Sequence, residues 1–136
     1  MQLTPYLFFN GDCTQALALY ERCLGAKVVA RMTWGEAPMA DQMPREMHGK
    51  VMHFLMQVDG QDVMGADAPP DRYSKPQGYF LAIRAGEIEE AERIFATLSE
   101  GGTVREPMSE TFFAHRFGMV VDRFGTPWMV LVQKAS

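Results

Sequence analysis

An internal duplication is the feature that most constrains the fold of this 136-residue chain. Each half follows the same predicted order of one strand, one helix and three further strands. In the first half we expect strands at 3–9, 27–34, 50–58 and 61–67, and a helix at 13–24. In the second half we expect strands at 79–83, from 103, at 113–121 and at 126–133, and a helix at 87–100. The repeated order predicts a single α+β domain, 1–136, made of two βαβββ modules at about 1–67 and about 77–134.

Apolar residues recur at helical spacing in both predicted helices. The first helix has a candidate cap at Asp12 and a stop at Gly25, and its apolar stripe is Cys13, Ala16, Leu17, Tyr20 and Leu24. The second helix ends at Gly101, and its stripe is Ile88, Ala91, Ile94, Phe95 and Leu98. After the third strand of the first half, Asp59-Gly60 predicts a tight hairpin turn, and a longer turn takes its place at 122–125.

Two segments lie outside the repeat. The stretch 35–49 contains three methionines and two prolines without clear periodicity, which is typical of a functional flap or a mobile loop. The shorter stretch 68–71 predicts a linker between the modules.

Composition narrows the class of protein. The chain is 47% hydrophobic with a net charge of −4, which argues for a globular protein and against a general binder of nucleic acid or anionic membranes. No apolar run approaches the ~18 residues of a membrane-spanning helix, and we expect a cytoplasmic protein. Cys13 and Cys23 lie on one predicted helix about 15 Å apart, too far for a disulfide, so both are expected to be reduced.

Several stretches of sequence resemble one protein family. They are 6–11 (YLFFNG), 50–53 (KVMH), 90–95 (EAERIF), 110–118 (ETFFAHRFG) and 122–129 (DRFGTPWM). In this order they resemble the PhnB-like branch of the vicinal oxygen chelate superfamily, which includes glyoxalases and bleomycin-resistance proteins. The resemblance implies two modules that form a curled mixed β-sheet around a cleft, commonly in a homodimer.

The resemblance also locates the positions that hold a metal ion in the superfamily's metalloenzymes. They fall here on Pro5, Met64, Tyr79 and Met129. Each methionine follows its hairpin glycine by four residues, so the duplication independently makes Met64 and Met129 equivalent. Proline has no donor atom, and a thioether is a poor ligand for hard or borderline divalent metals. We therefore expect no metal at these positions and no other cofactor.

Two basic side chains are candidates for catalysis or for ligand binding. A two-residue turn at Asp59-Gly60 would place Leu55 opposite Met64 and put His53 on the same face, toward the cleft. Counting from the hairpin aspartates maps His53 onto Arg116. Each also has a structural interpretation, His53 as a hydrogen-bonded strand residue and Arg116 as the partner of a nearby acid.

Further residues are candidates for contact with a small-molecule ligand. A register slip of one residue would exchange Arg116 for its neighbour His115. Tyr79, Met64 and Met129 would give the cleft a soft lining, and Trp34 at the edge of the flap is a candidate stacking platform. Core packing explains the methionines equally well, and Trp34 has an alternative role as a packing residue at the end of a strand.

The sequence is compatible with three functions. The first is a metal-independent homodimer that binds a small molecule in the inter-module cleft. The second is an enzyme, a lyase or isomerase with His53 as acid or base and Arg116 stabilising an anion, or a dioxygenase-type enzyme of the same superfamily. The third is a metalloenzyme whose ligands have moved to His53, His115 and flap carboxylates. A methyltransferase label attached to some PhnB-like sequences finds no support here, because the chain lacks a Gly-x-Gly-x-x-Gly loop.

Overall fold

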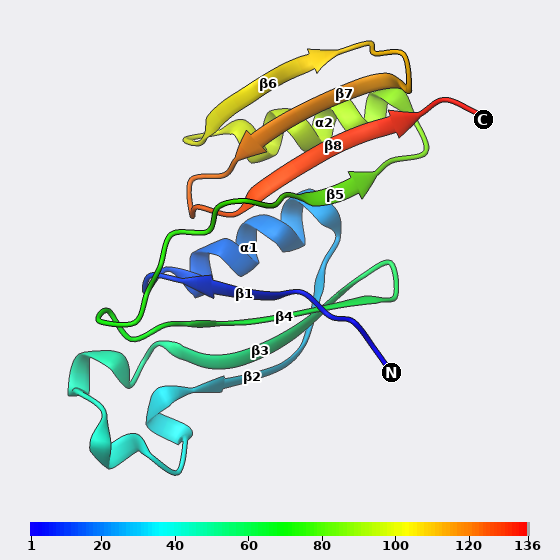
Figure 1. The fold of residues 1–136 in the computed structure, drawn as a ribbon. Helices are drawn as coiled ribbons and strands as arrows, with labels where there is room; N and C mark the ends of the chain where they lie inside the picture. Colours follow the sequence, from blue (N-terminus) through cyan, green and yellow to red (C-terminus); the bar gives the residue numbers. More distant parts are fainter. Residues whose placement is uncertain (136) are drawn as a thin grey trace. The chain divides into compact units, whose positions relative to one another are not determined.

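The computed structural model describes residues 1–135 and contains the two predicted modules. The first contains β1 (Tyr6–Phe9), α1 (Cys13–Leu24), β2 (Lys27–Thr33), β3 (Val51–Val58) and β4 (Gln61–Asp67). The second contains β5 (Leu81–Arg84), α2 (Ile88–Ser99), β6 (Thr103–Ser109), β7 (Ala114–Val121) and β8 (Pro127–Gln133). The chain divides into two compact units, Met1–Ser74 and a second that begins at Lys75 (Figure 1).

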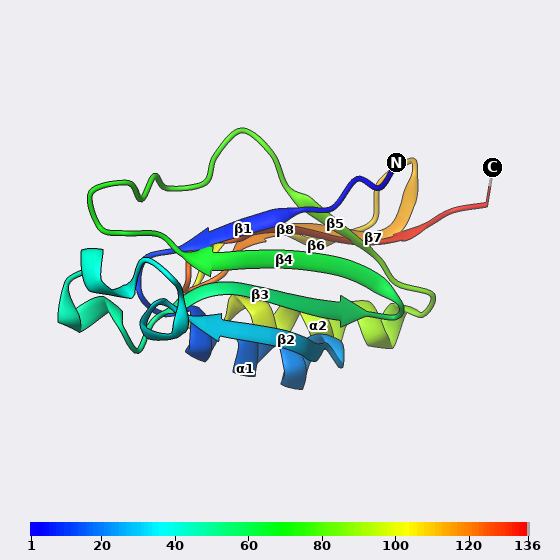
Figure 2. The same cartoon turned by 90° about the horizontal axis from the view of Figure 1, so that it is seen from below.

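Each unit has one four-stranded mixed sheet with the same topology. The strand orders are β1-β4-β3-β2 and β5-β8-β7-β6. In each sheet the first pair in this order is parallel, namely β1 with β4 and β5 with β8, and the other two pairs are antiparallel. Figure 2 shows that one helix lies on one face of each sheet. This is the α+β architecture of two βαβββ modules that the duplication predicts.

The core of each unit lies between its helix and its sheet. In the first unit the rings of Phe9, Tyr20 and Phe54 are in contact, with centroids 6.3–6.4 Å apart. All three side chains are fully buried. In the second unit Trp128 is buried, and its indole Nε1–H donates to Asp122 Oδ2 at 2.9 Å.

The helix boundaries follow the sequence signals, with two corrections. Gly25 is left-handed at φ 67° and ends α1, as predicted. Asp12 is the N-cap residue of α1, as predicted, but its side chain makes no capping hydrogen bond among the described residues, and the Cys13 N–H instead donates to Asp67 Oδ1 at 3.0 Å. On α2, Ile88 is 47% exposed and so does not belong to the buried stripe, because it lies at the first residue of the helix.

The strand boundaries contain two further corrections, of which the first is that the strand expected at 3–9 begins at Tyr6. Asp59 and Gly60 both have positive φ, 48° and 77°, which confirms the tight turn between β3 and β4. The last strand pair is joined as predicted by a longer turn. The predicted strand at 79–83 begins two residues later, at Leu81, because Leu81 is the first residue with a pairing partner on β8, Trp128.

The predicted flap consists of three short 3₁₀ helices, η1 (Trp34–Glu36), η2 (Ala40–Gln42) and η3 (Arg45–Met47). The His48 ring Nε2 lies 2.9 Å from the Ala40 carbonyl and 3.2 Å from that of Met43, so it holds the segment together. Cys13 and Cys23 are not joined in a disulfide, as predicted. Neither α1 nor α2 has the length and hydropathy that crossing a membrane requires.

Candidate functional site

The first sheet presents an aromatic surface on the face that α1 does not cover. Side chains alternate along β1, so that Leu7 and Phe9 are buried toward α1 while Tyr6 and Phe8 are 38% and 50% exposed. The Tyr6 and Phe8 rings are in contact, with centroids 5.1 Å apart. Parallel pairing with β4 places Tyr6 beside Met64 and Phe8 beside Ala66. We call this the open face of the first sheet.

A pocket of about 410 Å³ lies on the open face. Its walls come from β1, β3 and β4, from Trp34 at the start of the flap, and from the segment that follows β4. The lining residues are Tyr6, Phe8, Trp34, Met52, Ala66, Asp67, Ala68, Pro69, Arg72 and Ser74. The volume is within the range of pockets that bind small molecules, and the lining is mostly aromatic and aliphatic.

Asp67 holds several walls of this pocket together. Its carboxylate is 1% exposed and accepts backbone N–H groups from Cys13 and Val51, each at 3.0 Å. Its carbonyl oxygen accepts the Trp34 indole Nε1–H at 3.1 Å. One residue therefore fixes the start of α1, the start of β3 and the position of the Trp34 ring.

Burial, and secondarily the Asp67 charge, raise the pKa of the adjacent Cys13 thiol, which is therefore protonated and inert at neutral pH.

A polar pair spans the open face from Tyr6 on β1 to His53 on β3, across β4. The Tyr6 hydroxyl and His53 Nδ1 are 3.1 Å apart, and their rings are also close, with centroids 5.8 Å apart. Burial raises the pKa of Tyr6, and a smaller effect of Cys13 acts in the same direction. The hydroxyl is therefore protonated at neutral pH, and it donates to His53 Nδ1 or accepts from it according to the tautomer of the ring.

The structure places the predicted site residues of the first unit as follows. Trp34 lines the pocket. Leu55 lies opposite Met64, as predicted, and His53 contacts the pocket residue Tyr6 without itself lining the pocket. Met64 is next to Tyr6 on the open face but outside the lining. Trp34 thus lines the same pocket as Tyr6, and Tyr6 is the residue that His53 contacts. The roles of Trp34 and His53 in binding or catalysis stay predictions.

The other candidates belong to the second unit. Tyr79 precedes β5 and is 45% exposed, and His115 is exposed on β7. Met129 on β8 lies between Met119 of β7 and Ala82 of β5. The participation of these residues in an inter-module cleft stays a prediction.

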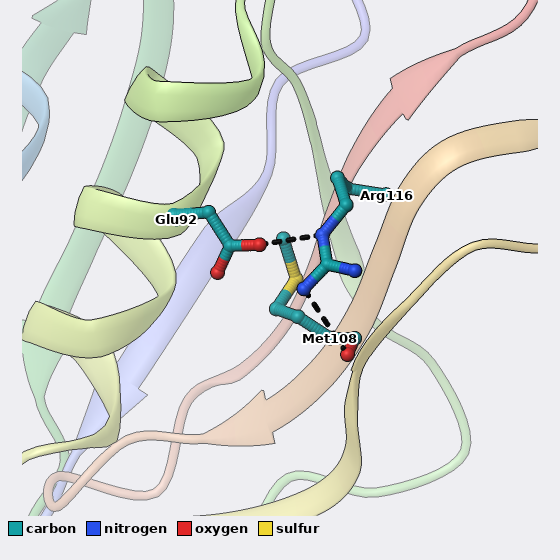
Figure 3. A network of polar contacts seen from close by, with 3 residues as sticks. All are labelled: Glu92, Met108 and Arg116. Atoms are coloured by element: carbon teal, nitrogen blue, oxygen red, sulfur yellow. Dashed lines mark hydrogen bonds and ion pairs between the residues drawn. The ribbon is translucent and has the colours of Figure 1, made fainter.

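Arg116 has a structural partner on α2. Its Nε donates to Glu92 Oε1 in an ion pair, and its second guanidinium nitrogen donates to the Met108 carbonyl at 3.3 Å (Figure 3). The guanidinium therefore lies on the face of the second sheet that α2 covers. His53 lies on the uncovered face of the first sheet, next to the inward-facing Phe54, so the two side chains do not occupy equivalent faces.

Strand pairing aligns the two modules differently from the count that treats the hairpin residues Asp59 and Asp122 as equivalent positions. Met64 pairs with Leu55, and its equivalent Met129 pairs with Met119. Two residues before these partners lie His53 and Phe117, which makes Phe117 the counterpart of His53. The predicted match with Arg116 is wrong because the second hairpin turn is longer than the first, which displaces the count by one residue.

The positions that the family resemblance equates with metal ligands carry side chains that bind divalent metals poorly. Pro5 and Tyr79 lie outside the strands, and the residues that pair with Met64 and Met129 on the neighbouring strands are Tyr6 and Ala82. None of these side chains offers the imidazole or carboxylate that divalent metal ions prefer. Within residues 1–135 there is no cluster of three or more His, Cys, Asp or Glu suited to a metal ion.

Tyr6, Phe8, Met52 and Arg72 line the pocket but are not among the site residues predicted from the sequence. A signal existed for Tyr6 and Phe8, because strand alternation separates them from the buried Leu7 and Phe9. Arg72 had no comparable signal. It lies just beyond the predicted linker, and only the path of the chain after β4 brings it to the pocket.

Comparisons with known proteins agree with this fold. A model of the family described as 3-demethylubiquinone-9 3-methyltransferase matches residues 1–131. Protein YjdN of Escherichia coli (strain K12) is 37% identical over 98% of this chain and 97% of its own length.

Solved structures are similar over nearly the whole chain. Protein PA1353 from Pseudomonas aeruginosa is 36% identical with a TM-score of 0.89, covering 99% of each chain. A putative 3-demethylubiquinone-9 3-methyltransferase, the PhnB protein from Bacillus cereus, is 21% identical with a TM-score of 0.82, covering 97% of this chain and 99% of its own. The fosfomycin resistance protein FosX from Listeria monocytogenes shares the fold at 13% identity, with a TM-score of 0.64 and coverage of 98% and 93%.

Proposed function

Because this chain belongs to the 3-demethylubiquinone-9 3-methyltransferase family, the PhnB-like branch of the glyoxalase/bleomycin-resistance superfamily, we propose that it binds a small, largely apolar molecule. The ligand enters the pocket on the open face of the first sheet. The observation that carries the proposal is the lining: two rings from β1 and one from the flap surround a volume of about 410 Å³. Exposed aromatic rings gathered in a concave site are typical of ligand recognition.

Binding to a neutral bicyclic aromatic probe, 2-naphthamide, tests this proposal. The Phe8 side chain is 50% exposed, so Phe8→Ala removes a pocket wall without opening a cavity in the core. We expect calorimetric titration to show affinity about tenfold weaker, the equivalent of ~1.4 kcal/mol of apolar contact. Val29→Ala is the matched control, because Val29 is 57% exposed on β2 and outside the pocket lining. Equal affinities for Phe8→Ala and the unaltered protein would contradict the proposal.

Metal independence is part of the same proposal. It is supported by the residues at the four positions that the resemblance implies, Pro5, Met64, Tyr79 and Met129, none of which is a histidine or an acid. Elemental analysis of freshly purified protein should find only a small fraction of one metal ion per chain, and divalent metals should not raise the melting temperature. Stoichiometric metal together with a rise of several degrees would contradict this part of the proposal.

The second candidate is an enzyme of the same superfamily, and the Tyr6–His53 contact favours it specifically. A phenol that lines a pocket and lies 3.1 Å from an imidazole nitrogen is a possible proton donor to a bound carbonyl compound. His53→Ala separates the two functions once a substrate is found. It should abolish turnover in an enzyme, whereas in a binding protein it should leave the affinity for 2-naphthamide within about threefold.

The assembly and location of the protein are proposed on the family resemblance. We propose that it acts in the cytoplasm as a homodimer. The mass of the protein in solution, measured by light scattering, tests the dimer.

A further inference from the structure

The polar groups of the pocket indicate the charge of its ligand, provided that the proposed binding function holds. Two charged side chains are among the lining residues, Asp67 and Arg72. They differ in how far their charge is already satisfied by the protein, and this difference decides which one is available to a ligand.

The Asp67 carboxylate is committed to the fold. It is 1% exposed, and each of its oxygens accepts one backbone N–H at 3.0 Å, from Cys13 and from Val51. Even its carbonyl oxygen is used, by the Trp34 indole. A cationic ligand group would have to compete with these bonds, so the pocket does not offer Asp67 as an anion for recognition.

The Arg72 guanidinium is available. It is exposed at the rim of the pocket, and no ion pair or side-chain hydrogen bond of Arg72 occurs within residues 1–135. Its backbone is nevertheless held, because the Arg72 N–H donates to the Pro69 carbonyl at 2.8 Å. A turn anchored in this way presents a forked cation beside an aromatic pocket.

We infer that the pocket binds a planar aromatic carboxylate, whose ring lies among Tyr6, Phe8 and Trp34 and whose carboxylate pairs with Arg72. The rings supply apolar and π contacts, and the Trp34 N–H, being bonded to Asp67, offers no donor to compete for the anion. Guanidinium matches a carboxylate with two parallel N–H donors, which gives the site its preference for this group.

Paired ligands test the inference. The full chain is titrated calorimetrically with 2-naphthoate and with the uncharged 2-naphthamide. We expect the carboxylate to bind about tenfold more tightly, as charge-assisted hydrogen bonds at a partly exposed site allow. Arg72→Gln should remove that preference, so that the two ligands bind with equal affinity, while Arg72→Lys should retain part of it. Arg45→Gln is the matched control, since Arg45 is exposed on η3 and outside the lining, and it should keep the full preference.

The outcomes separate this inference from the proposed function. Equal binding of the two ligands, or a preference that survives in Arg72→Gln, would overturn the carboxylate inference while the proposed pocket remains. Binding of neither ligand would overturn the proposed function itself. A third ligand, 2-naphthylphosphonate, identifies the anion: tighter binding than the carboxylate, again dependent on Arg72, would replace a carboxylate by a phosphonate.

Discussion

Asp67 is the residue on which the geometry of the first unit depends most. Its carboxylate joins the N-terminus of α1 to β3, although Cys13 and Val51 are 54 and 16 residues away in sequence. A short polar side chain at the end of a strand is unremarkable in a sequence, and Asp12, directly before the helix, is the more obvious cap. Nothing local distinguishes the two, because the bond to Cys13 exists only once β4 has paired beside β1.

Asp67→Ala should be strongly destabilising. It leaves two buried backbone N–H groups without acceptors, so we expect the free energy of unfolding to fall by about 2–4 kcal/mol, measured by urea denaturation. Asp71→Ala is the control, because Asp71 is exposed, and its effect should stay within about 0.5 kcal/mol. Similar stabilities of the two variants would contradict the role assigned to Asp67.

Glu36 should titrate below the ordinary pKa of a glutamate. Its Oε1 accepts the Thr33 backbone N–H and the Thr33 hydroxyl, each at 2.9 Å, and these bonds lower the pKa of the fully exposed carboxyl, the backbone bond more strongly. The stabilisation is present above the unfolded-state pKa and is lost as the pH falls through the lowered folded-state pKa. In Thr33→Val, NMR titration should show the Glu36 pKa rising part of the way to its ordinary value, since the backbone bond remains. Thr33→Ser should keep it low, and an unchanged pKa in Thr33→Val would refute the hydroxyl's contribution.

Close packing between neighbouring strands explains why position 65 is a glycine, which no pattern in the sequence predicts. Gly65 lies in β4 where the Leu7 carbonyl of β1 and the Phe54 ring of β3 both approach it, and a Cβ there would lie 2.5 Å from a ring carbon. Gly65→Ala should therefore lower the free energy of unfolding by about 1–3 kcal/mol in urea denaturation. Gly49→Ala is the control, since its added methyl would meet open space. Equal stability of both variants would show that Phe54 moves aside at little cost.

Prediction succeeded for elements that local signals define. The helix stop at Gly25 and the turn at Asp59-Gly60 need only the left-handed backbone that these residues adopt readily, and both are present. Prediction failed for strand boundaries and side-chain faces that depend on how the strands pair. The start of β5 depends on where β8 begins, and the faces of His53 and Arg116 depend on the lengths of two different hairpin turns. The pocket shows the same division, since alternation in β1 was visible in the sequence while the position of Arg72 was not.

At the scale of the whole molecule, duplication explains both the fold and the inequality of its halves. The two sheets share one topology, yet the open-face residues Tyr6 and His53 of the first unit correspond to Ala82 and Phe117 in the second. The polar pair therefore has no counterpart in the second unit. A repeated module thus retains its strand order, which the core enforces, while its open face is free to diverge into a site in one copy only.

The proposed homodimer is a property of the whole chain and is tested at that scale. Light scattering coupled to size-exclusion chromatography should give about twice the chain mass of 15.3 kDa. The measurement is repeated over a wide range of protein concentrations, because a specific dimer keeps this mass until it is diluted below its dissociation constant. A mass of one chain at every concentration would refute the dimer, and a mass that keeps rising with concentration would indicate open-ended association instead of a closed pair.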